Sequence, residues 1–330
     1  MAQNLPVTMA CGPYDRLQAL KEGVVRPEGI DLRYIEIQSP PEIFARMLKT
    51  NSFDVAEMSS AHYITMKSRG DFPYLALPVF PSRLFRHGFI FINRHSDIKA
   101  PTDLAGKRIA VQEYRQSAGV WIRGILKSEY GVDLSDVTWL EGGVDAPRRF
   151  DETMDLRPAR DLTIDLLGPD TCISDVLASG EVDAYFGARA PQAFFRSDDV
   201  VRLFPDYRGE ERQYFERTGI YPIMHTMIVT EELHLEHPWA AESLYKALSD
   251  AKKWALEQMR FSGAQRYIVP WLFADIDEID ELFGGDPCPY GLEPNRKTLE
   301  TAVGYLFEQG FIDRPMDIEE LFIPIVGWEE

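Results

Sequence analysis

The first half of the chain alternates short apolar runs with segments whose apolar positions recur at helical spacing. Leu5–Ala10 and Phe53–Met58 are continuous apolar runs typical of buried strands, and Ile30–Ile37 alternates apolar and polar positions as a half-buried strand does. A helix is predicted from Pro40 onward, with an apolar stripe that begins at Ile43. This alternation of strands and helices predicts a mainly parallel sheet covered by helices.

The same pattern restarts in the second third of the chain. The elements predicted there are strands at Arg108–Gln112, Val137–Leu140 and Val182–Gly187, and helices at Ser174–Ser179 and at Ser117–Glu129, which Ser117 is expected to cap. In both halves a strand-to-helix loop recurs, and an aspartate precedes an apolar strand. We interpret this as an indication of two similarly built lobes.

The last third is predicted to be mainly helical after one more strand. That strand is expected at Ile220–Thr230, and a long helix is expected to begin at His237 and to continue to about Arg260. The least structured internal stretch is 142–170, where charged residues and prolines are frequent. A charged loop or insertion is the simple interpretation, and a lid or an oligomer contact is the alternative.

Length and charge narrow the class of protein. A chain of 330 residues suggests about two domains. With 53 acidic and 35 basic side chains its net charge is −18, which disfavours binding to nucleic acid or to anionic membrane surfaces. An anionic small molecule stays open as a ligand, because a local field can oppose the net charge.

The sequence also predicts the cellular location of the protein and the redox state of its cysteines. No stretch approaches the roughly 20 continuous apolar residues of a membrane span. Met1–Asp15 lacks the basic and apolar regions of a signal peptide, so a cytoplasmic protein is expected. The three cysteines form no CxxC pair, which fits a reducing compartment and disfavours a cysteine-rich zinc site.

Several segments together resemble the 4,5-dihydroxyphthalate decarboxylase family, a branch of the type 2 periplasmic-binding-protein superfamily. The resemblance is carried by VRPEGIDLRYIEI (Val25–Ile37), FDVAEMSSAHYI (Phe53–Ile64), FPSRLFRHGFIFIN (Phe80–Asn93), DLAGKRIAV (Asp103–Val111) and GEVDAYFGARAP (Gly180–Pro191). The fourth segment is generic to the superfamily, whereas EGIDLRY, FDVAEMS and FRHGFIFIN are more specific to the decarboxylase-like branch. The resemblance extends from about residue 5 to about residue 310.

The resemblance implies an α/β fold of the two-lobed type 2 periplasmic-binding-protein kind. Each lobe is expected to be a mainly parallel sheet flanked by helices, with the ligand in a cleft between the lobes. Lobe I is expected at 1–94 and 222–330, and lobe II at 95–221 with the charged loop at 142–170 inside it. The hinges are expected near Asn93–Ser96 and Gly219–Pro222.

The reaction that the resemblance implies is decarboxylation of a hydroxylated aromatic dicarboxylic acid, 4,5-dihydroxyphthalate, to protocatechuate and CO2. Because a naked aryl anion is too unstable, the easier route protonates the ring carbon that bears the departing carboxylate. The site then requires a general acid, a partner for a phenol and arginines that bind carboxylates. No cofactor is required, and the sequence has no GxGxxG or P-loop motif.

Candidates in the first lobe follow the first and third predicted strands. Arg16 lies in the strand-to-helix loop CGPYDR and is expected to bind substrate, with a surface arginine as the alternative. Glu57 is a catalytic candidate at the end of the strand FDVAEM. Ser59 and Ser60 come next as substrate-binding candidates, although either one alternatively only caps the following helix.

The densest cluster of candidates is Ser82–His87. It contains two substrate-binding candidates, Arg83 and Arg86, and the alternative is a solvated loop. His87 is the first choice for the general acid, because an imidazole titrates near neutrality. His225, near the predicted return crossing, is the alternative acid or base, and a hydrogen-bonded core histidine is an equal interpretation of it.

Candidates in the second lobe complete the set of substrate-binding residues. Gln116 and Ser117 lie at the start of the predicted helix of that lobe, where backbone N–H groups bind anions, and simple capping is the alternative. Arg189 follows the strand DAYFGAR, and Tyr221 lies near the return crossing.

No cofactor is expected, and the expected partner is a small anionic aromatic substrate. A divalent metal held by Glu57, His87 and His225 stays open as an alternative, because histidine with carboxylate suits zinc. No HExxH-like spacing supports that metal site. A homo-oligomer also stays open.

Three other functions compete with the decarboxylase. A non-catalytic solute-binding protein for an aromatic or other organic anion has the same fold, and fold does not fix function. A pyrimidine synthase of the thiamine pathway is disfavoured, because the cysteines here are few and scattered. A decarboxylase-like enzyme with another substrate is separated from the first hypothesis only by the shape of the binding site.

Overall fold

The structure is a computed structural model that describes residues 4–70, 72–148, 156–158 and 162–325. It divides the chain into two compact units. Unit 1 comprises Met1–Arg83, His225–Leu299 and Met316–Glu330, and unit 2 comprises Leu84–Met224 and Glu300–Pro315. The chain therefore leaves unit 1 and returns to it twice, so that unit 1 contains both ends of the sequence.

Unit 1 is built on a five-stranded sheet. Its strands, in the order in which they are joined, are β2 (Ile30–Glu36), β1 (Leu5–Cys11), β3 (Val55–Ser59), β11 (Ile223–Thr230) and β4 (Tyr74–Arg83). Its helices are η1 (Asp15–Leu17), α1 (Gln18–Lys21), α2 (Pro40–Thr50), α3 (Ser60–Ser68), α8 (Glu231–Glu236), α9 (Trp239–Arg260), α10 (Leu272–Phe283), η5 (Glu293–Asn295) and η6 (Ile318–Glu320).

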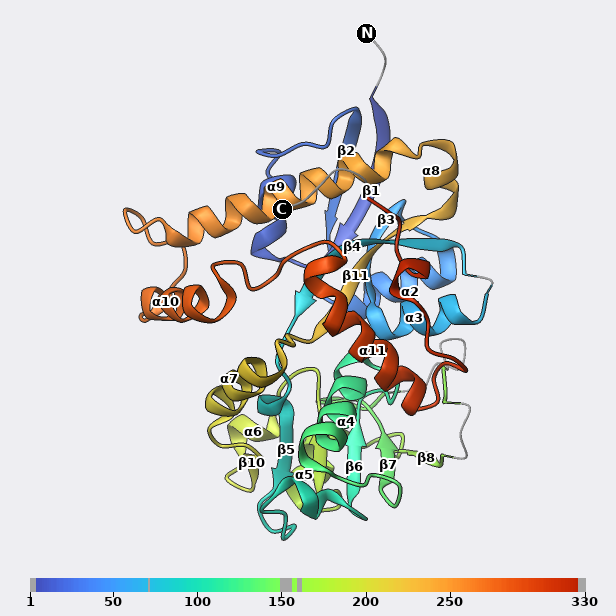
Figure 1. The fold of residues 1–330 in the computed structure, drawn as a ribbon. Coiled ribbons are helices and arrows are strands. Elements are labelled where there is room, and N and C mark those ends of the chain that lie inside the picture. Colours follow the sequence, from blue (N-terminus) through green and yellow to red (C-terminus); the bar gives the residue numbers. More distant parts are fainter. Residues whose placement is uncertain (1–3, 71, 149–155, 159–161, 326–330) are drawn as a thin grey trace. The chain divides into compact units, whose positions relative to one another are not determined.

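The core of unit 1 lies between this sheet and α9, which crosses it in Figure 1. Leu244 and Leu248 of α9 are buried in one apolar cluster with Val7 of β1, Val55 of β3 and Val229 of β11. The long helix predicted from the sequence is confirmed, and it begins at Trp239 because the backbone at His237 is still non-helical. β1 pairs in parallel with β2 and β3, whereas β11 runs antiparallel to β3.

Unit 2 is built on a six-stranded sheet. Its strands, in joined order, are β10 (Val200–Arg202), β5 (Ile90–Asn93), β9 (Ala184–Phe186), β6 (Arg108–Val111), β7 (Thr138–Glu141) and β8 (Ile164–Leu166). Its helices are η2 (His87–Phe89), η3 (Pro101–Leu104), α4 (Ser117–Tyr130), α5 (Ile173–Ser179), α6 (Ala193–Arg196), α7 (Tyr207–Thr218) and the greater part of α11 (Arg296–Glu308).

Strands β9, β6, β7 and β8 run parallel, β5 pairs antiparallel with β9, and β10 pairs antiparallel with β5 at the edge of the sheet. Together with unit 1 this confirms the predicted α/β class with mainly parallel sheets. β8 was not predicted, because its three residues lie in the charged stretch 142–170. Of that stretch, 149–155 and 159–161 lie outside the described residues.

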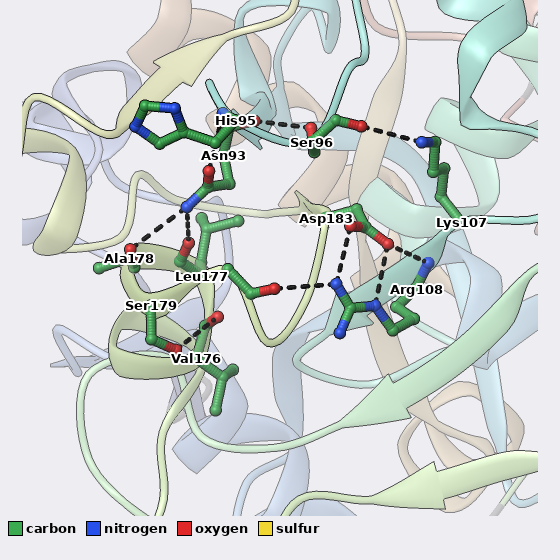
Figure 2. A network of polar contacts seen from close by, with 11 residues as sticks. Asn93, His95, Ser96, Lys107, Arg108, Val176, Leu177, Ala178, Ser179 and Asp183 are labelled. Carbon is green, nitrogen blue, oxygen red and sulfur yellow. Dashed lines mark hydrogen bonds and ion pairs between the residues drawn. The ribbon is translucent and has the colours of Figure 1, made fainter.

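The division into units differs from the predicted lobe boundaries by three residues at 222–224, which lie in unit 2, and by longer segments in two other places. The first is at 84–94, which was predicted to belong to lobe I. β5 lies there, and it pairs with β9 and β10 of unit 2. Figure 2 shows how the segment after β5 is also tied to unit 2: Asn93 donates to the carbonyl of Leu177 at 2.8 Å, and Lys107 donates to the carbonyl of Ser96. The predicted hinge at Asn93–Ser96 is thus a hydrogen-bonded corner within unit 2.

The second difference is at 300–315, which was also predicted to lie in lobe I. The ring of Tyr305 packs against Trp121 of α4, with 5.5 Å between centroids, and Gln309 accepts a hydrogen bond from Arg123 at 2.7 Å. These contacts bury the second half of α11 in unit 2. Aromatic packing of this kind has no signature in the local sequence.

After β1, residues 15–21 form a 3-10 turn followed by the four-residue α1. Elsewhere, two local predictions need correction. Gln116, not Ser117, occupies the N-cap position of α4, because its backbone is extended. The strand predicted from Ile220 begins at Ile223.

Among the described residues, no helix is both long and apolar enough to span a membrane.

Candidate active site

The centre of the candidate site in unit 1 is a carboxylate–imidazole pair. Nδ1 of His225 lies 2.5 Å from Oε1 of Glu57. The register of the antiparallel ladder explains the contact: His225 lies opposite Ser59, and Met227 lies opposite Glu57. Residues two apart in a strand share a face, so Glu57 and His225 are diagonal neighbours on one side of the sheet.

Glu57 is fully buried and has further donors around it. The hydroxyl of Tyr14 donates to Oε1 at 2.6 Å, and the backbone N–H of Gly12 donates to Oε2 at 2.9 Å. The thiol of Cys11 lies 3.4 Å from Oε2. A Cβ added at Gly12 would lie 3.3 Å from Oε2, so the glycine allows the backbone to approach the carboxylate closely.

These contacts determine the protonation of Glu57. Burial by itself would raise its pKa, but the charge of His225, the hydrogen bond from His225 and those from Tyr14 and Gly12 outweigh burial and lower the pKa. Burial and the charge of Glu57 raise the pKa of the Tyr14 phenol and of the Cys11 thiol. Glu57 is therefore an ionised acceptor surrounded by groups that keep their protons.

The ionised carboxylate fixes the orientation of His225. Nδ1 carries the proton that faces Glu57, which leaves Nε2 as the ring nitrogen that can exchange a proton with another molecule. The rings of Phe44 and His225 pack edge to face, with 5.1 Å between centroids. The His225 side chain is 18% exposed, so it is the member of the pair that reaches solvent.

Arg16 lies beside this pair in η1, the 3-10 helix between β1 and α1. Its Nε donates to the carbonyl of Pro81 at 2.7 Å, its NH1 lies 3.1 Å from Asp15, and its guanidinium lies over the ring of Tyr14 at 4.6 Å. These contacts hold the guanidinium in one orientation while its side chain stays 22% exposed. A partly exposed, oriented arginine is suited to bind a carboxylate.

Two of the three other predicted residues of unit 1, Ser59 and Arg83, make structural contacts within the unit. Ser59 caps α3 by accepting from the backbone N–H of His62, as the simpler interpretation predicted. The buried hydroxyl of Ser60 has no hydrogen-bond partner among the described residues. Arg83 is buried and donates to the side chain of Asn295 and to the carbonyl of Pro289.

The remaining six sequence-predicted residues lie in unit 2, and His87 is the one whose surroundings differ most from expectation. Its side chain is 1% exposed and packs against Tyr130, Phe204 and Tyr214, and neither ring nitrogen has a hydrogen-bond partner among the described residues. Burial, with a contribution from Arg217, lowers the pKa of His87 to about 4. The premise that this imidazole titrates near neutrality therefore does not hold.

The other unit 2 candidates are spread over several elements. Arg86 is buried next to η2, Gln116 and Ser117 begin α4, and the ring of Tyr221 packs against Phe85 at 4.5 Å. Arg189 is 57% exposed and forms an ion pair with Asp145. The expected cleft stays a prediction.

Sequence reasoning did not select Tyr14, Gly12 or Cys11 as partners of Glu57. The loop CGPYDR was recognised as a strand-to-helix loop, but nothing in it indicates which side chains turn toward β3. Among the described residues, no group of three or more His, Cys, Asp and Glu side chains is arranged to hold a metal ion. The metal set of Glu57, His87 and His225 is thus not assembled within either unit.

Comparisons with known proteins identify the family of the chain. The family model described as "ABC transporter, phosphonate, periplasmic substrate-binding protein" matches residues 18–184. The periplasmic aliphatic sulphonate binding protein of Escherichia coli has a similar structure, with a TM-score of 0.54, 14% identity and coverage of 98% of both chains. The chain therefore has a periplasmic-binding-protein-like α/β fold.

Two curated relatives narrow the family further. The 4,5-dihydroxyphthalate decarboxylase of Comamonas testosteroni is 35% identical over 322 residues, which cover 97% of each chain. The 4,5-dihydroxyphthalate decarboxylase of Pseudomonas putida is 37% identical over 213 residues, which cover 64% of this chain and 82% of the relative. The chain belongs to the 4,5-dihydroxyphthalate decarboxylase family.

Proposed function

We propose that the protein is a carboxy-lyase that converts 4,5-dihydroxyphthalate to protocatechuate and CO2. Two relatives with that name and the buried Glu57–His225 pair support the proposal. The pair is the observation that carries it, because an oriented imidazole backed by an ionised carboxylate is a group that delivers and removes protons.

In the proposed mechanism His225 is the general acid. Its Nε2–H transfers a proton to the ring carbon that bears the departing carboxylate, and the para hydroxyl supplies electron density to the ring. The bond from that carbon to the carboxylate then breaks, its electron pair restores the aromatic ring, and CO2 leaves. The product keeps both hydroxyls and one carboxylate, so one proton enters for each CO2 released.

Glu57, Tyr14 and Arg16 support this step in different ways. Glu57 holds the proton on Nδ1 and stabilises the charged imidazole before the transfer. Tyr14 and the N–H of Gly12 fix Glu57 and help to keep it ionised. Arg16 is proposed to bind an anionic oxygen of the substrate. No metal or organic cofactor is needed in this scheme.

A non-catalytic solute-binding protein is the second candidate. The family model of periplasmic substrate-binding proteins and the structural likeness to a sulphonate-binding protein favour it. The enzyme is preferred, because binding an anion does not require an oriented acid–base pair such as Glu57–His225. The cytoplasmic location and the oligomeric state stay predictions.

The proposed function is tested by incubating the purified protein with 4,5-dihydroxyphthalate, with and without added divalent metal, and measuring CO2 and protocatechuate. Stoichiometric formation of both products is expected. Close hydroxybenzoates and phthalate itself serve as comparison substrates. Binding of these acids at micromolar concentration without turnover of any of them would contradict the enzyme and favour the solute-binding protein.

A further inference from the structure

Tyr267 is the one half-buried side chain of an otherwise exposed loop of unit 1. The loop, residues 261–271, joins α9 to α10 (Figure 1). Within these residues, all of which the structure describes, every residue except Tyr267 is exposed. The Tyr267 hydroxyl donates to Oδ2 of Asp15 in η1 at 3.3 Å. The loop therefore reaches back to the element that carries Arg16.

Further contacts fasten the same loop to unit 1. NH1 of Arg266 donates to Oε1 of Gln18, the first residue of α1, at 2.9 Å. The Arg266 guanidinium also lies 4.6 Å from the centre of the Trp254 ring of α9. Within the loop, Gln265 donates to the carbonyl of Tyr267 at 3.0 Å. These contacts place Tyr267 independently of the hydrogen bond that its own hydroxyl makes.

Asp15 divides its two carboxylate oxygens between Arg16 and Tyr267. Oδ1 accepts from the backbone N–H of Arg16 at 2.8 Å and lies 3.1 Å from NH1 of the same residue. Oδ2 accepts from the Tyr267 hydroxyl. Burial and the charge of Asp15 raise the pKa of Tyr267 to about 12, so the phenol keeps its proton and stays a donor at neutral pH. One oxygen of Asp15 is thus paired with the Arg16 side chain, and the other is engaged elsewhere.

This division leaves one terminal nitrogen of Arg16 to a ligand. Nε donates to the carbonyl of Pro81 at 2.7 Å, and NH1 pairs with Asp15. None of the residues that the structure describes accepts a hydrogen bond from NH2 of Arg16. The guanidinium is therefore oriented through Nε and NH1, while NH2 can donate to an anionic oxygen.

The Tyr267 hydroxyl matters because a carboxylate with two available oxygens pairs with a guanidinium in a bidentate manner. Without Tyr267, Asp15 would be able to close on Arg16 with both oxygens. Such a pair would neutralise Arg16 and occupy the nitrogen that a ligand needs. Tyr267 opposes this rearrangement by engaging Oδ2.

We propose that Tyr267 is a positioning residue for the substrate, which acts through Asp15 to keep NH2 of Arg16 available to a substrate carboxylate. The assignment rests on the proposed function, which supplies the binding of an anionic oxygen by Arg16. Among the described residues, Tyr267 forms no hydrogen bond with Glu57 or His225. Its effect is therefore expected on substrate binding and not on the proton transfer.

The test measures the binding of two probes by calorimetry. Phthalate carries both carboxylates of the substrate, and catechol carries none. Wild-type protein is expected to bind phthalate at least about tenfold more tightly than catechol. Tyr267→Phe is expected to weaken phthalate binding by about threefold or more and to leave catechol binding within about twofold of wild type. Arg16→Met is expected to weaken phthalate binding by about tenfold or more.

Combining the two substitutions separates positioning from a merely structural role. In the Arg16→Met background, Tyr267→Phe is expected to change phthalate affinity by less than about 1.5-fold, because the group through which it acts is gone. A structural role would weaken binding by the same factor in both backgrounds. With 4,5-dihydroxyphthalate as substrate, Tyr267→Phe is expected to raise KM by about threefold or more and to leave kcat within about twofold of wild type.

Tyr74→Phe is the matched control. Tyr74 lies on β4 of unit 1, and its hydroxyl donates to the carbonyl of Met47 at 2.8 Å, so this substitution removes a buried hydrogen bond that does not involve Asp15. Tyr74→Phe is expected to unfold at a lower temperature than wild type and to keep the phthalate affinity of wild type. Tyr267→Phe is expected to unfold close to the temperature of wild type and to lose phthalate affinity.

Three results would overturn the proposal: wild-type protein without a preference for phthalate, Tyr267→Phe with the phthalate affinity of wild type, or an equal effect of Tyr267→Phe in the wild-type and Arg16→Met backgrounds. Failure of the proposed function is a different result. It appears as absence of CO2 release from 4,5-dihydroxyphthalate, whatever the affinities for phthalate and catechol.

Discussion

Glu57 and His225 are 168 positions apart in the sequence, and Nδ1 of His225 lies 2.5 Å from Oε1 of Glu57. The contact forms because β3 and β11 are antiparallel neighbours in the sheet of unit 1. It joins a fully buried carboxylate to an imidazole that is partly exposed. The proposed proton transfer depends on this relationship.

Removing either member of the pair is expected to affect turnover more than binding. His225→Asn and Glu57→Gln are each expected to lower kcat by about 100-fold or more, because the first removes the acid and the second removes its charged acceptor. Product-formation kinetics give kcat, and calorimetry with protocatechuate gives binding. His87→Asn serves as the comparison, with turnover per folded molecule expected to stay near that of wild type. Loss of turnover in that variant alone would return the acid role to His87.

Tyr14→Phe tests the support around Glu57. The substitution removes the hydrogen bond to Oε1, so the pKa of Glu57 is expected to rise and kcat to fall by about five- to thirtyfold. The acidic limb of the pH–rate profile is expected to move to higher pH, which a merely structural role of Tyr14 would not cause. An unchanged profile would show that Tyr14 does not position Glu57.

His87 and Glu211 are expected to affect stability with opposite dependence on pH. The pKa of His87 is lowered to about 4, so its contribution is complete above about pH 6.5 and is lost as the pH falls toward 4. The pKa of Glu211 is raised to about 7, so its contribution is complete below about pH 4.5 and is lost as the pH rises toward 7. Each effect amounts to about 3 kcal/mol, and in wild type they largely cancel.

Denaturant unfolding of two variants across pH 4 to 7 separates these effects. Relative to wild type, His87→Phe is expected to gain stability as the pH falls, and Glu211→Gln to gain stability as the pH rises. Parallel pH curves for wild type and either variant would contradict the assignment for that residue.

Gly124→Ala tests the packing of α11 on α4 within unit 2. A Cβ at Gly124 would lie 2.1 Å from the ring of Tyr305, so a loss of about 2 kcal/mol or more in the free energy of unfolding is expected. Gly304→Ala is the matched control: a Cβ there meets nothing within 4 Å, and a gain of up to about 1 kcal/mol is expected. Equal effects of the two substitutions would show that the α4–α11 contact is not tight.

The order of strands and helices follows from periodicity, because a strand or helix that covers a core must repeat its apolar positions. The boundaries of the units do not follow from it. β5 belongs to unit 2 through its pairing with β9 and β10, and the end of α11 belongs there through Tyr305. Both are long-range contacts that no local pattern encodes.

Glu57, His225 and Arg16 of the candidate site were predictable from the sequence, but its other members and its geometry were not. Glu57 and His225 are polar residues in apolar strands, which marks them in the sequence. Their contact depends on ladder register, and the role of Tyr14 depends on the path of a loop. His87 has the same local signature as His225, yet aromatic rings surround it. The contact of His225 with Glu57 and the apolar burial of His87 separate the two histidines.

The most direct test of the central claim is decarboxylation of 4,5-dihydroxyphthalate in deuterium oxide, followed by NMR of the product. Protocatechuate is expected to carry one deuterium at the ring carbon that lost its carboxylate, and to form about 100-fold or more slowly in His225→Asn than in wild type. Binding of the substrate without any labelled product, or an unchanged rate in His225→Asn, would contradict proton transfer by His225.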